Sequence, residues 1–214
     1  LCSGVVLGLL PLQLANGETI SHDAFLQTPA QFAHVFSSLG LQPGDRIAVQ
    51  VAKSPQALAI YAACAQSGTI FLPLNTGYTA SEVAYFVGNS GAKLLICDDK
   101  SVDELRPIAQ SAAACLETLN ADGTGSLSDK AQDSPTSFET VDRTSDDLAA
   151  FLYTSGTTGR SKGAMLSQEN LLSNARTLVK AWRFTSDDTL LHALPIFHTH
   201  GLFVADNVSL LAGN

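Results

Sequence analysis

The stretch RIAVQVAKSPQALAIYAACAQSGTIFLPL, residues 46–74, decides the fold class of this chain. Its first part places an apolar side chain at every second position from Ile47 onward, which is typical of a β-strand. Ser54 followed by Pro55 indicates a helix start, because serine caps a first turn and proline fits the first helical position. The helix is predicted to end at Gly68, and an apolar run of strand length follows it. Strand, helix and strand in this order predict the βαβ unit of a parallel sheet.

The same signals continue on both sides of this unit. Residues 31–39 carry apolar side chains at helical spacing, and Thr79 with Glu82 matches a capping box that opens another helix. A short apolar strand is predicted over residues 93–97. We therefore expect residues 1–116 to form a βαβ-rich first part, and the fold class to be α/β with a mostly parallel sheet.

The composition excludes some classes of protein. Of the 214 residues, 45% are apolar types, which is enough for a core of one large domain or two small ones. The chain has 12 Lys and Arg against 20 Asp and Glu, a formal net charge of −8. Affinity for a nucleic-acid backbone comes from clustered cations. We therefore expect no nucleic-acid partner, although the charge balance leaves room for a local phosphate site.

Cysteine usage and the N-terminal segment bear on the compartment. The cysteines at positions 2, 64, 97 and 115 include no CxxC pair, so we expect buried, reduced thiols rather than a disulfide or zinc framework. The apolar run over residues 4–10 is shorter than the about 20 residues of a membrane span, and no basic residue precedes it. We expect no membrane span and a cytoplasmic protein, or a mitochondrial-matrix protein if a transit peptide is missing. Because the first residue is Leu, we expect truncation, and we expect it at both ends.

Two further parts follow the first one. Residues 117–147 are rich in Asp, Ser, Thr and Gly, which predicts a solvated, mobile acidic connector with room for one short strand. Residues 148–214 regain a regular pattern. The elements predicted there are a strand over 148–153, a helix after Ser167 with one apolar face, a buried strand over 190–197, and a helix over 201–211.

A loop rich in glycine and hydroxyl groups lies between that strand and that helix: Thr154-Ser155-Gly156-Thr157-Thr158-Gly159-Arg160-Ser161-Lys162-Gly163. Glycines let backbone N–H groups approach an anion, hydroxyls add donors, and Lys162 supplies a mobile positive charge. These residue types predict a polyphosphate site rather than a flexible linker. The spacing is not that of a Walker A motif, because Gly156 and Lys162 are six apart and Gly163 follows the lysine, so a P-loop kinase or GTPase is disfavoured.

Together with Leu152 and Tyr153, this loop resembles the AMP-binding signature of the adenylate-forming superfamily. That superfamily includes acyl-CoA synthetases, luciferases and the adenylation domains of peptide synthetases. Ser161 stands where the family commonly has Pro, which leaves the phosphate donors intact. The resemblance implies that Thr154 and Lys162 are catalytic, at the β- and γ-phosphates of ATP. The cofactor-binding residues that it implies are Thr154, Ser155, Gly156, Thr157, Thr158, Gly159, Lys162 and Gly163.

A second motif, Leu194-Pro195-Ile196-Phe197-His198-Thr199-His200-Gly201, resembles the aromatic-plus-histidine motif that follows the phosphate loop in this superfamily. The resemblance implies that His198 borders the acyl pocket and gates it, as a catalytic and substrate-binding residue. His200 is unusual for enzymes of fatty acids, and with Ser161 it makes the chain most similar to the malonyl-CoA synthetases.

A second carboxylate on the substrate needs a hydrogen-bond donor or a cation, and His200 can supply one. His200 is therefore assigned to substrate binding; the alternative is that it only packs in a loop and caps a carbonyl. The other histidines, His22, His34 and His192, are expected to be surface or satisfied core residues.

The resemblance implies an ATP-dependent acid–thiol ligase that adenylates a carboxylate and then forms a thioester. It implies ATP, Mg²⁺ and coenzyme A as cofactors, with the metal ligands unassigned, and a small carboxylic acid as substrate, malonate or a close relative such as methylmalonate. The alternatives are a medium- or long-chain fatty acyl-CoA synthetase, transfer to a carrier protein, and a non-catalytic nucleotide-binding module. Pocket polarity, beginning at His200, separates the first alternative from malonate.

In this superfamily the adenine and ribose motifs and a smaller C-terminal lid domain lie further along the chain than the two motifs found here. Residues 1–214 are therefore expected to be part of the large N-terminal AMP-binding domain, with the lid domain absent. We expect these residues alone to be inactive in the overall reaction.

Overall fold

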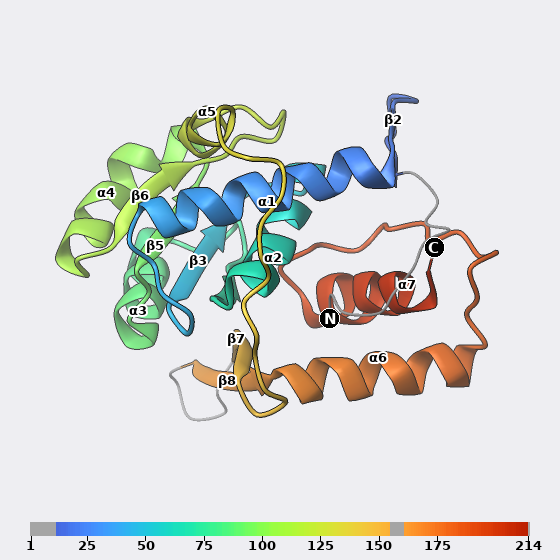
Figure 1. The fold of residues 1–214 in the computed structure, drawn as a ribbon. Coiled ribbons are helices and arrows are strands. Elements are labelled where there is room, and N and C mark those ends of the chain that lie inside the picture. The colour runs from blue at the N-terminus through green and yellow to red at the C-terminus, as the bar shows by residue number, and fades with distance from the viewer. Residues whose placement is uncertain (1–11, 155–160, 214) are drawn as a thin grey trace.

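A computed structural model of the chain describes residues 12–154 and 161–213. Its centre is a six-stranded sheet in the spatial order β6-β5-β3-β4-β7-β8, in which all neighbours are parallel except β7 and β8 (Figure 1). The strands are β3 (Arg46–Gln50), β4 (Ile70–Pro73), β5 (Leu94–Cys97), β6 (Cys115–Thr118), β7 (Leu148–Thr154) and β8 (Lys162–Ser167). The mostly parallel α/β fold is as the sequence predicts.

Helices connect the strands and cover both faces of the sheet. They are α1 (His22–Ser38), α2 (Pro55–Ser67), α3 (Ala80–Ser90), α4 (Val102–Ser111), α5 (Ser126–Ala131), α6 (Gln168–Trp182) and α7 (Asn207–Ala212). A short 3₁₀ turn, η1 (Asp99–Ser101), precedes α4, and a π-helical segment, η2 (His200–Asp206), precedes α7. A small antiparallel pair, β1 (Leu12–Gln13) and β2 (Thr19–Ile20), lies apart from the sheet (Figure 1).

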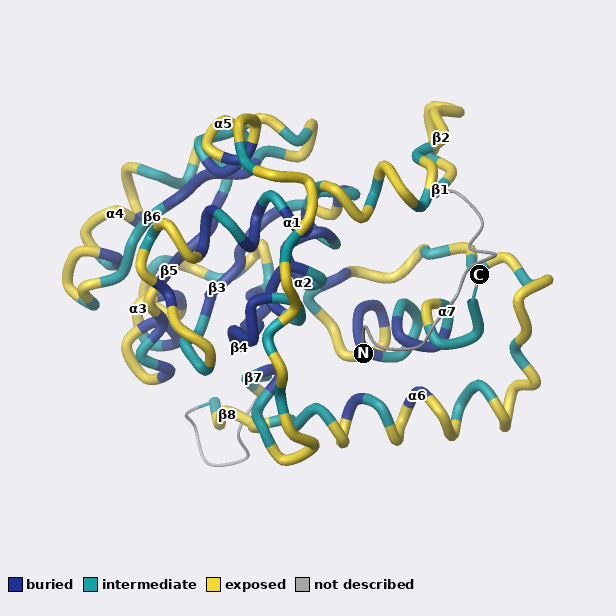
Figure 2. The backbone as a smooth tube through the Cα atoms, viewed as in Figure 1, coloured by how far each residue is buried: buried dark blue, intermediate teal, exposed yellow. Residues whose placement is uncertain are grey.

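The central strands β3, β4 and β5 are buried on both faces, whereas β8 is largely exposed (Figure 2). Ile47 and Val49 of β3 point into a core shared with α1, α2 and α5, whereas Ala48 points into a second core with α3 and α4. Successive side chains of a strand alternate between faces, and crossover helices cover both faces of a parallel sheet. The central strands therefore consist almost wholly of buried side chains.

Local sequence signals place the helix ends correctly. The Ser54 hydroxyl accepts a hydrogen bond from the Ala57 N–H at 3.1 Å, and α2 ends at Gly68 with φ of 69°. Thr79 and Glu82 form the predicted capping box of α3. These contacts satisfy backbone groups that a helix end leaves unpaired.

Helix α1 begins at His22 rather than near residue 31. Ser21 caps it, accepting a hydrogen bond from the Ala24 N–H at 3.2 Å. The first turns are mostly exposed and therefore show no apolar periodicity, while Phe32 and Phe36 are buried. Periodicity detects only the turns that pack on a core.

The first half of residues 117–147 differs from the predicted solvated connector. Strand β6 crosses the expected boundary between residues 116 and 117, and α5 follows it with Leu127 and Ala131 buried. Polar and small residues concealed both elements, since β6 lies at a sheet edge and α5 buries few side chains.

The prediction for residues 190–197 is wrong, because no strand forms there. Leu191 is 88% exposed and Leu194 is 48% exposed, and only Ile196 is buried. The strand beside β7 is instead β8, which the sequence interpretation missed. A short apolar run does not by itself distinguish a strand from an irregular segment. In the part of the chain that the structure describes, no helix has the length and apolar character to cross a bilayer.

Candidate active site

The loop predicted to bind phosphate joins β7 to β8 as a hairpin. Thr154 and Lys162 are partners across its neck, where the Thr154 hydroxyl donates to the Lys162 carbonyl at 3.4 Å. Both residues are exposed. The structure thus brings together two residues predicted to be catalytic, and places Gly163 beside them, opposite Tyr153. The other predicted loop residues, Ser155, Gly156, Thr157, Thr158 and Gly159, lie outside the described residues.

Helix α3 supports this hairpin through side chains. The Tyr85 hydroxyl donates to the Ser161 carbonyl at 2.9 Å, and the Tyr153 hydroxyl donates to Asn89 Oδ1 at 2.7 Å. The rings of Phe86 and Tyr153 lie 4.4 Å apart, and burial raises the pKa of Tyr153. The neck of the hairpin is therefore fixed to a helix with well-formed ends rather than held by the sheet alone.

The neck lies at the carboxyl edge of the parallel strands, where binding sites of open α/β sheets form. At the end of β3, the buried Gln50 amide donates to the carbonyls of Asn75 and Tyr78 at 3.0 and 3.1 Å. These bonds hold the connection from β4 to α3 at the same edge. No sequence signal distinguished Gln50, because it occupies an ordinary strand position.

His198 and His200 lie on one short stretch at the start of η2, and both side chains are exposed. The Phe197 ring, with its centroid 4.8 Å away, is a ring neighbour of the His198 imidazole. The His198 carbonyl accepts a hydrogen bond from the Leu202 N–H at 3.0 Å. Among the described residues, no hydrogen bond or ion pair joins either imidazole to the hairpin. The hairpin residues and the two histidines therefore form separate parts of the candidate site.

His192 has a more specific environment than the sequence predicted. Its Nε2 lies 2.7 Å from the Gly201 carbonyl and 3.2 Å from Asp206 Oδ1. The neighbouring Asp206 raises the pKa of His192, and burial raises the pKa of Asp206. Lys53, just beyond β3, donates to the carbonyls of His192 and Leu194, and partial burial lowers its pKa. Lys53 is far from His192 and Asp206 in the sequence, so no local sequence pattern linked these three residues.

The aromatic ring of Tyr61 on α2 packs between Phe71 and Phe203, with centroid distances of 5.4 and 5.6 Å. Its hydroxyl donates to Asn207 Oδ1 at 3.1 Å, and burial raises the pKa of Tyr61. Segment η2 is thus anchored to the main core beside the His192 contacts.

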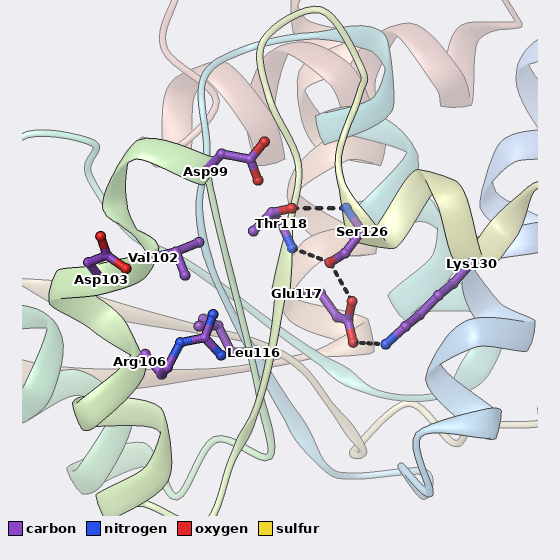
Figure 3. Close-up of a pocket in the computed structure, with 9 residues that line it drawn as sticks. All are labelled: Asp99, Val102, Asp103, Arg106, Leu116, Glu117, Thr118, Ser126 and Lys130. Carbon is purple, nitrogen blue, oxygen red and sulfur yellow. Dashed lines mark hydrogen bonds and ion pairs between the residues drawn. The ribbon is translucent and has the colours of Figure 1, made fainter.

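A hollow of about 460 Å³ lies elsewhere, at the outer edge of the sheet between α4, β6 and α5 (Figure 3). Glu117 is paired there with Lys130 and accepts from the Ser126 hydroxyl at 2.5 Å. Asp99 and Asp103 also line it, so its wall carries both signs of charge, and its buried charge, Glu117, already pairs with Lys130. This arrangement does not suit a polyphosphate.

The described cysteines fit the expected thiol state. Cys64 and Cys97 are buried and Cys115 is half-buried, and all three are free. Burial raises the pKa of each of the two buried thiols to about 12. Within residues 12–154 and 161–213, no three His, Cys, Asp or Glu side chains are placed to hold a metal ion.

Comparisons with known proteins agree with this fold. The chain superposes on MatB from Rhodopseudomonas palustris, solved both apo and ATP-bound, with a TM-score of 0.93 and 51% identity over 96% of this chain. It is 34% identical over 202 residues to a fatty acid–[acyl-carrier-protein] ligase of Streptomyces coeruleorubidus, and 31% identical over 174 residues to a malonate–CoA ligase of Arabidopsis thaliana. These matches cover 91% and 79% of this chain.

The chain spans only part of these relatives: 41% of MatB, 38% of the Streptomyces ligase and 28% of the malonate–CoA ligase. The family model described as AMP-binding enzyme matches residues 10–214, a range that includes the hairpin and the histidine motif. This chain, with its mostly parallel sheet, its hairpin at the carboxyl edge and its two motifs in the expected order, belongs to the AMP-binding enzyme family.

Proposed function

We propose that this chain is part of an ATP-dependent acid–CoA ligase that converts malonate to malonyl-CoA. The observation that carries the proposal is the exposed neck of the β7–β8 hairpin, where Thr154 and Lys162 face each other at the carboxyl edge of the sheet. The similarity to MatB, which has been solved with ATP bound, supports a nucleotide at this hairpin.

Lys162 and the loop before it act on the phosphates. Lys162 supplies positive charge to the β- and γ-phosphates of ATP and stabilises the pyrophosphate as it leaves. The Thr154 hydroxyl and the donors of Ser155, Gly156, Thr157, Thr158, Gly159 and Gly163 orient the same phosphates. Mg²⁺, which the family resemblance implies, adds positive charge at the phosphates when it is bound with the nucleotide. We assign no protein ligand to it.

The acid needs positioning more than activation. A carboxylate is already ionised at neutral pH, so its attack on the α-phosphorus needs no strong general base. His198 borders the acid and gates its approach, and the acyl-adenylate then reacts with the thiol of coenzyme A. Because the chain spans less than half of its relatives, further parts of the protein complete this second step.

Malonate carries a second carboxylate, and His200 offers a donor or a cation for it. The similarity to a malonate–CoA ligase supports this choice. The similarity to a fatty acid ligase supports a second candidate, a medium- or long-chain fatty acid as substrate. The exposed imidazole of His200 favours the dicarboxylate, since a fatty acyl chain requires an apolar wall.

Release of pyrophosphate from ATP tests the proposal in the full-length protein. Malonate, methylmalonate, acetate and octanoate are compared as acids, and release with malonate but not octanoate is expected. Lys162→Met should lower the rate by about 100-fold, because one charge that stabilises the leaving group is lost. Lys180→Met, at an exposed position in the last turn of α6, is the matched control and should leave the rate unchanged.

Three other results of the pyrophosphate assay would change the proposal. Release with octanoate alone would keep the acid ligase but replace malonate with a fatty acid. Full activity of the Lys162→Met protein would remove the hairpin from the phosphate site. If a folded full-length protein releases no pyrophosphate with any of the four acids, the proposed function is contradicted.

A further inference from the structure

The stretch that leads to the two site histidines is held by several polar contacts and buries one apolar side chain, Ile196. Residues 190–198 form neither helix nor strand, and Leu191 and Leu194 are largely exposed. Lys53 Nζ donates to the carbonyls of His192 and Leu194, the latter at 3.1 Å. Because these leucines bury little surface, the part of the stretch before the buried Ile196 depends on the contacts of Lys53 and of the His192 side chain.

The side chain of His192 makes the second set of contacts, which join the stretch to η2 further along the chain. His192 Nε2 donates to the Gly201 carbonyl at 2.7 Å and faces Asp206 Oδ1 at 3.2 Å, so residue 192 is tied to the two ends of η2. His198 and His200 lie within the loop that these bonds close. The side chains of His192 and Asp206 are only 15% and 14% exposed, so solvent screens their attraction weakly.

This cluster is strongly charged for its size and incompletely bonded. The Asp206 carboxylate acts electrostatically on Lys53, on His192 and on the Tyr61 hydroxyl of α2. Three buried atoms of the cluster, His192 Nδ1, Asp206 Oδ2 and Asn207 Nδ2, have no hydrogen-bond partner within the described residues. A partly satisfied buried cluster is held less firmly than a fully bonded one, and its strength depends on its charges.

We propose that Lys53, His192 and Asp206 are positioning residues that latch the segment bearing His198 and His200 onto η2 and the end of β3, and thereby set the affinity for the acid substrate. The inference rests on the proposed function, because the acid is assigned to these histidines. The latch acts through the segment and not through contact with the substrate, so it should change the KM for the acid and leave the KM for ATP unchanged.

The latch also predicts a dependence on pH. The attraction is strongest when His192 is protonated and Asp206 is ionised. Since Asp206 raises the pKa of His192, the charge on the imidazole is present below that raised pKa and is lost as the pH rises through it. The Nε2–H bond to Gly201 survives in the neutral imidazole. The KM for the acid should therefore rise with pH, and Asp206→Asn should flatten this rise.

The experiment uses the full-length protein and two measurements. The variants are Asp206→Asn, Lys53→Met, Lys53→Arg, His192→Ala and His192→Gln, with Lys100→Met as the matched control, since Lys100 is an exposed lysine paired with Asp98. The KM values for malonate and ATP come from pyrophosphate release, and hydrogen–deuterium exchange of residues 190–200 is followed by mass spectrometry. Asp206→Asn and Lys53→Met should raise the KM for malonate about tenfold, with the KM for ATP within about twofold.

The conservative variants separate a latch from a general loss of structure. Lys53→Arg and His192→Gln keep a donor, so they should retain much of the wild-type affinity and protection, whereas Lys53→Met and His192→Ala should not. Exchange of residues 190–200 should be faster in the weakened variants and unchanged in Lys100→Met. Equal exchange and equal KM for malonate in all folded variants would overturn the latch.

The two proposals fail in different ways. If the wild-type protein releases no pyrophosphate with malonate, the proposed function fails. If the weakened variants nevertheless exchange faster over residues 190–200, the latch is supported as a structural contact, and its proposed effect on the affinity for malonate is overturned. If the wild-type protein uses malonate and every variant matches it in both measurements, the ligase stands and the latch is rejected.

Discussion

At the scale of single residues, Gly201 is the described glycine at which an added Cβ atom would meet its neighbours most closely. A Cβ atom added there would lie 2.0 Å from the Pro195 carbonyl oxygen and 2.8 Å from the Pro195 carbonyl carbon. Both are backbone atoms, so no side chain can rotate away to make room. The close approach lets the stretch before His198 fold back directly against η2.

Gly201→Ala should therefore be strongly destabilising. We expect a loss of about 1–3 kcal/mol, the range of overpacked sites, and a higher KM for the acid because the histidine segment is displaced. Gly88→Ala in α3 is the control: no atom lies within 4 Å of its added Cβ, and alanine favours a helix. Thermal unfolding of the full-length protein measures both. Equal melting temperatures for the two variants would contradict the close contact at Gly201.

The burial and pairing of Glu117 could not be predicted from the sequence alone. It is one of several carboxylates in an acidic stretch, yet its side chain is only 4% exposed and it is bonded to Lys130 and Ser126. Burial without a partner costs far more than the same charge at the surface. The stability of the fold therefore depends on Lys130 of α5, which pairs with the Glu117 carboxylate.

Lys130→Met should lower the free energy of unfolding by about 2 kcal/mol, because it leaves the Glu117 carboxylate buried with one partner fewer. The double variant Glu117→Gln with Lys130→Met should recover part of this loss. Lys100→Met, at an exposed lysine paired with Asp98, should cost at most about 0.5 kcal/mol. Urea unfolding of the full-length variants gives these differences, and similar losses for the two lysines would show that Glu117 is not specially dependent on its partner.

At the scale of elements, α3 connects helix capping to the active site. Its capping box at Thr79 and Glu82 fixes one end, and Tyr85, Phe86 and Asn89 along its length hold the neck of the β7–β8 hairpin. A change at the cap, which is far from Lys162 in the sequence, should therefore reach the placement of Lys162.

Thr79→Ala should destabilise the protein by about 1 kcal/mol through the lost cap. The Thr79 backbone N–H and, second, its hydroxyl lower the pKa of Glu82. The contribution of the Glu82 carboxylate is therefore present above its ordinary pKa and is lost as the pH falls through the lowered one. The penalty of Thr79→Ala, measured by urea unfolding at several pH values, should shrink in acid. Ser111→Ala, at an exposed residue of α4, is the control and should have no effect at any pH.

At the scale of the whole molecule, the sheet order β6-β5-β3-β4-β7-β8 places β7 beside β4, although a long stretch of chain separates them, and the parallel pairing brings the end of β7 to the carboxyl edge. Strand β8 follows with its Met165 side chain 62% exposed. The hairpin and the histidine segment are carried by different elements, so a complete site requires groups that bridge them. The chain covers 41% of MatB.

Residues 1–214 alone should therefore fail to complete the ligase reaction. We expect no malonyl-CoA from the isolated chain with ATP, malonate and coenzyme A, and product from the full-length protein under the same conditions. Circular dichroism provides the control that the isolated chain is folded. Full turnover by the folded 214-residue chain would contradict this expectation.

Much of the fold could be predicted because it depends on local rules. The strands and the capped helices between Arg46 and Cys97, and the strand that begins at Leu148, follow from apolar runs, caps and glycine stops that act within a few residues. The motifs also identified the family, since the glycine- and hydroxyl-rich loop and its lysine are contiguous in the chain. The roles of Lys162, His198 and His200 remain predictions.

Tertiary structure alone decided what depends on distant partners. Whether residues 190–197 form a strand depends on pairing, and β8 holds the place beside β7. Whether Glu117 is solvated depends on Lys130, and whether His192 is an ordinary histidine depends on Lys53 and Asp206. The sequence by itself determined the α/β class, the capped helices and the family, because those follow from neighbouring residues. Burial, pairing and charge partners arise only when segments far apart in the chain meet, which is why only the folded structure decided them.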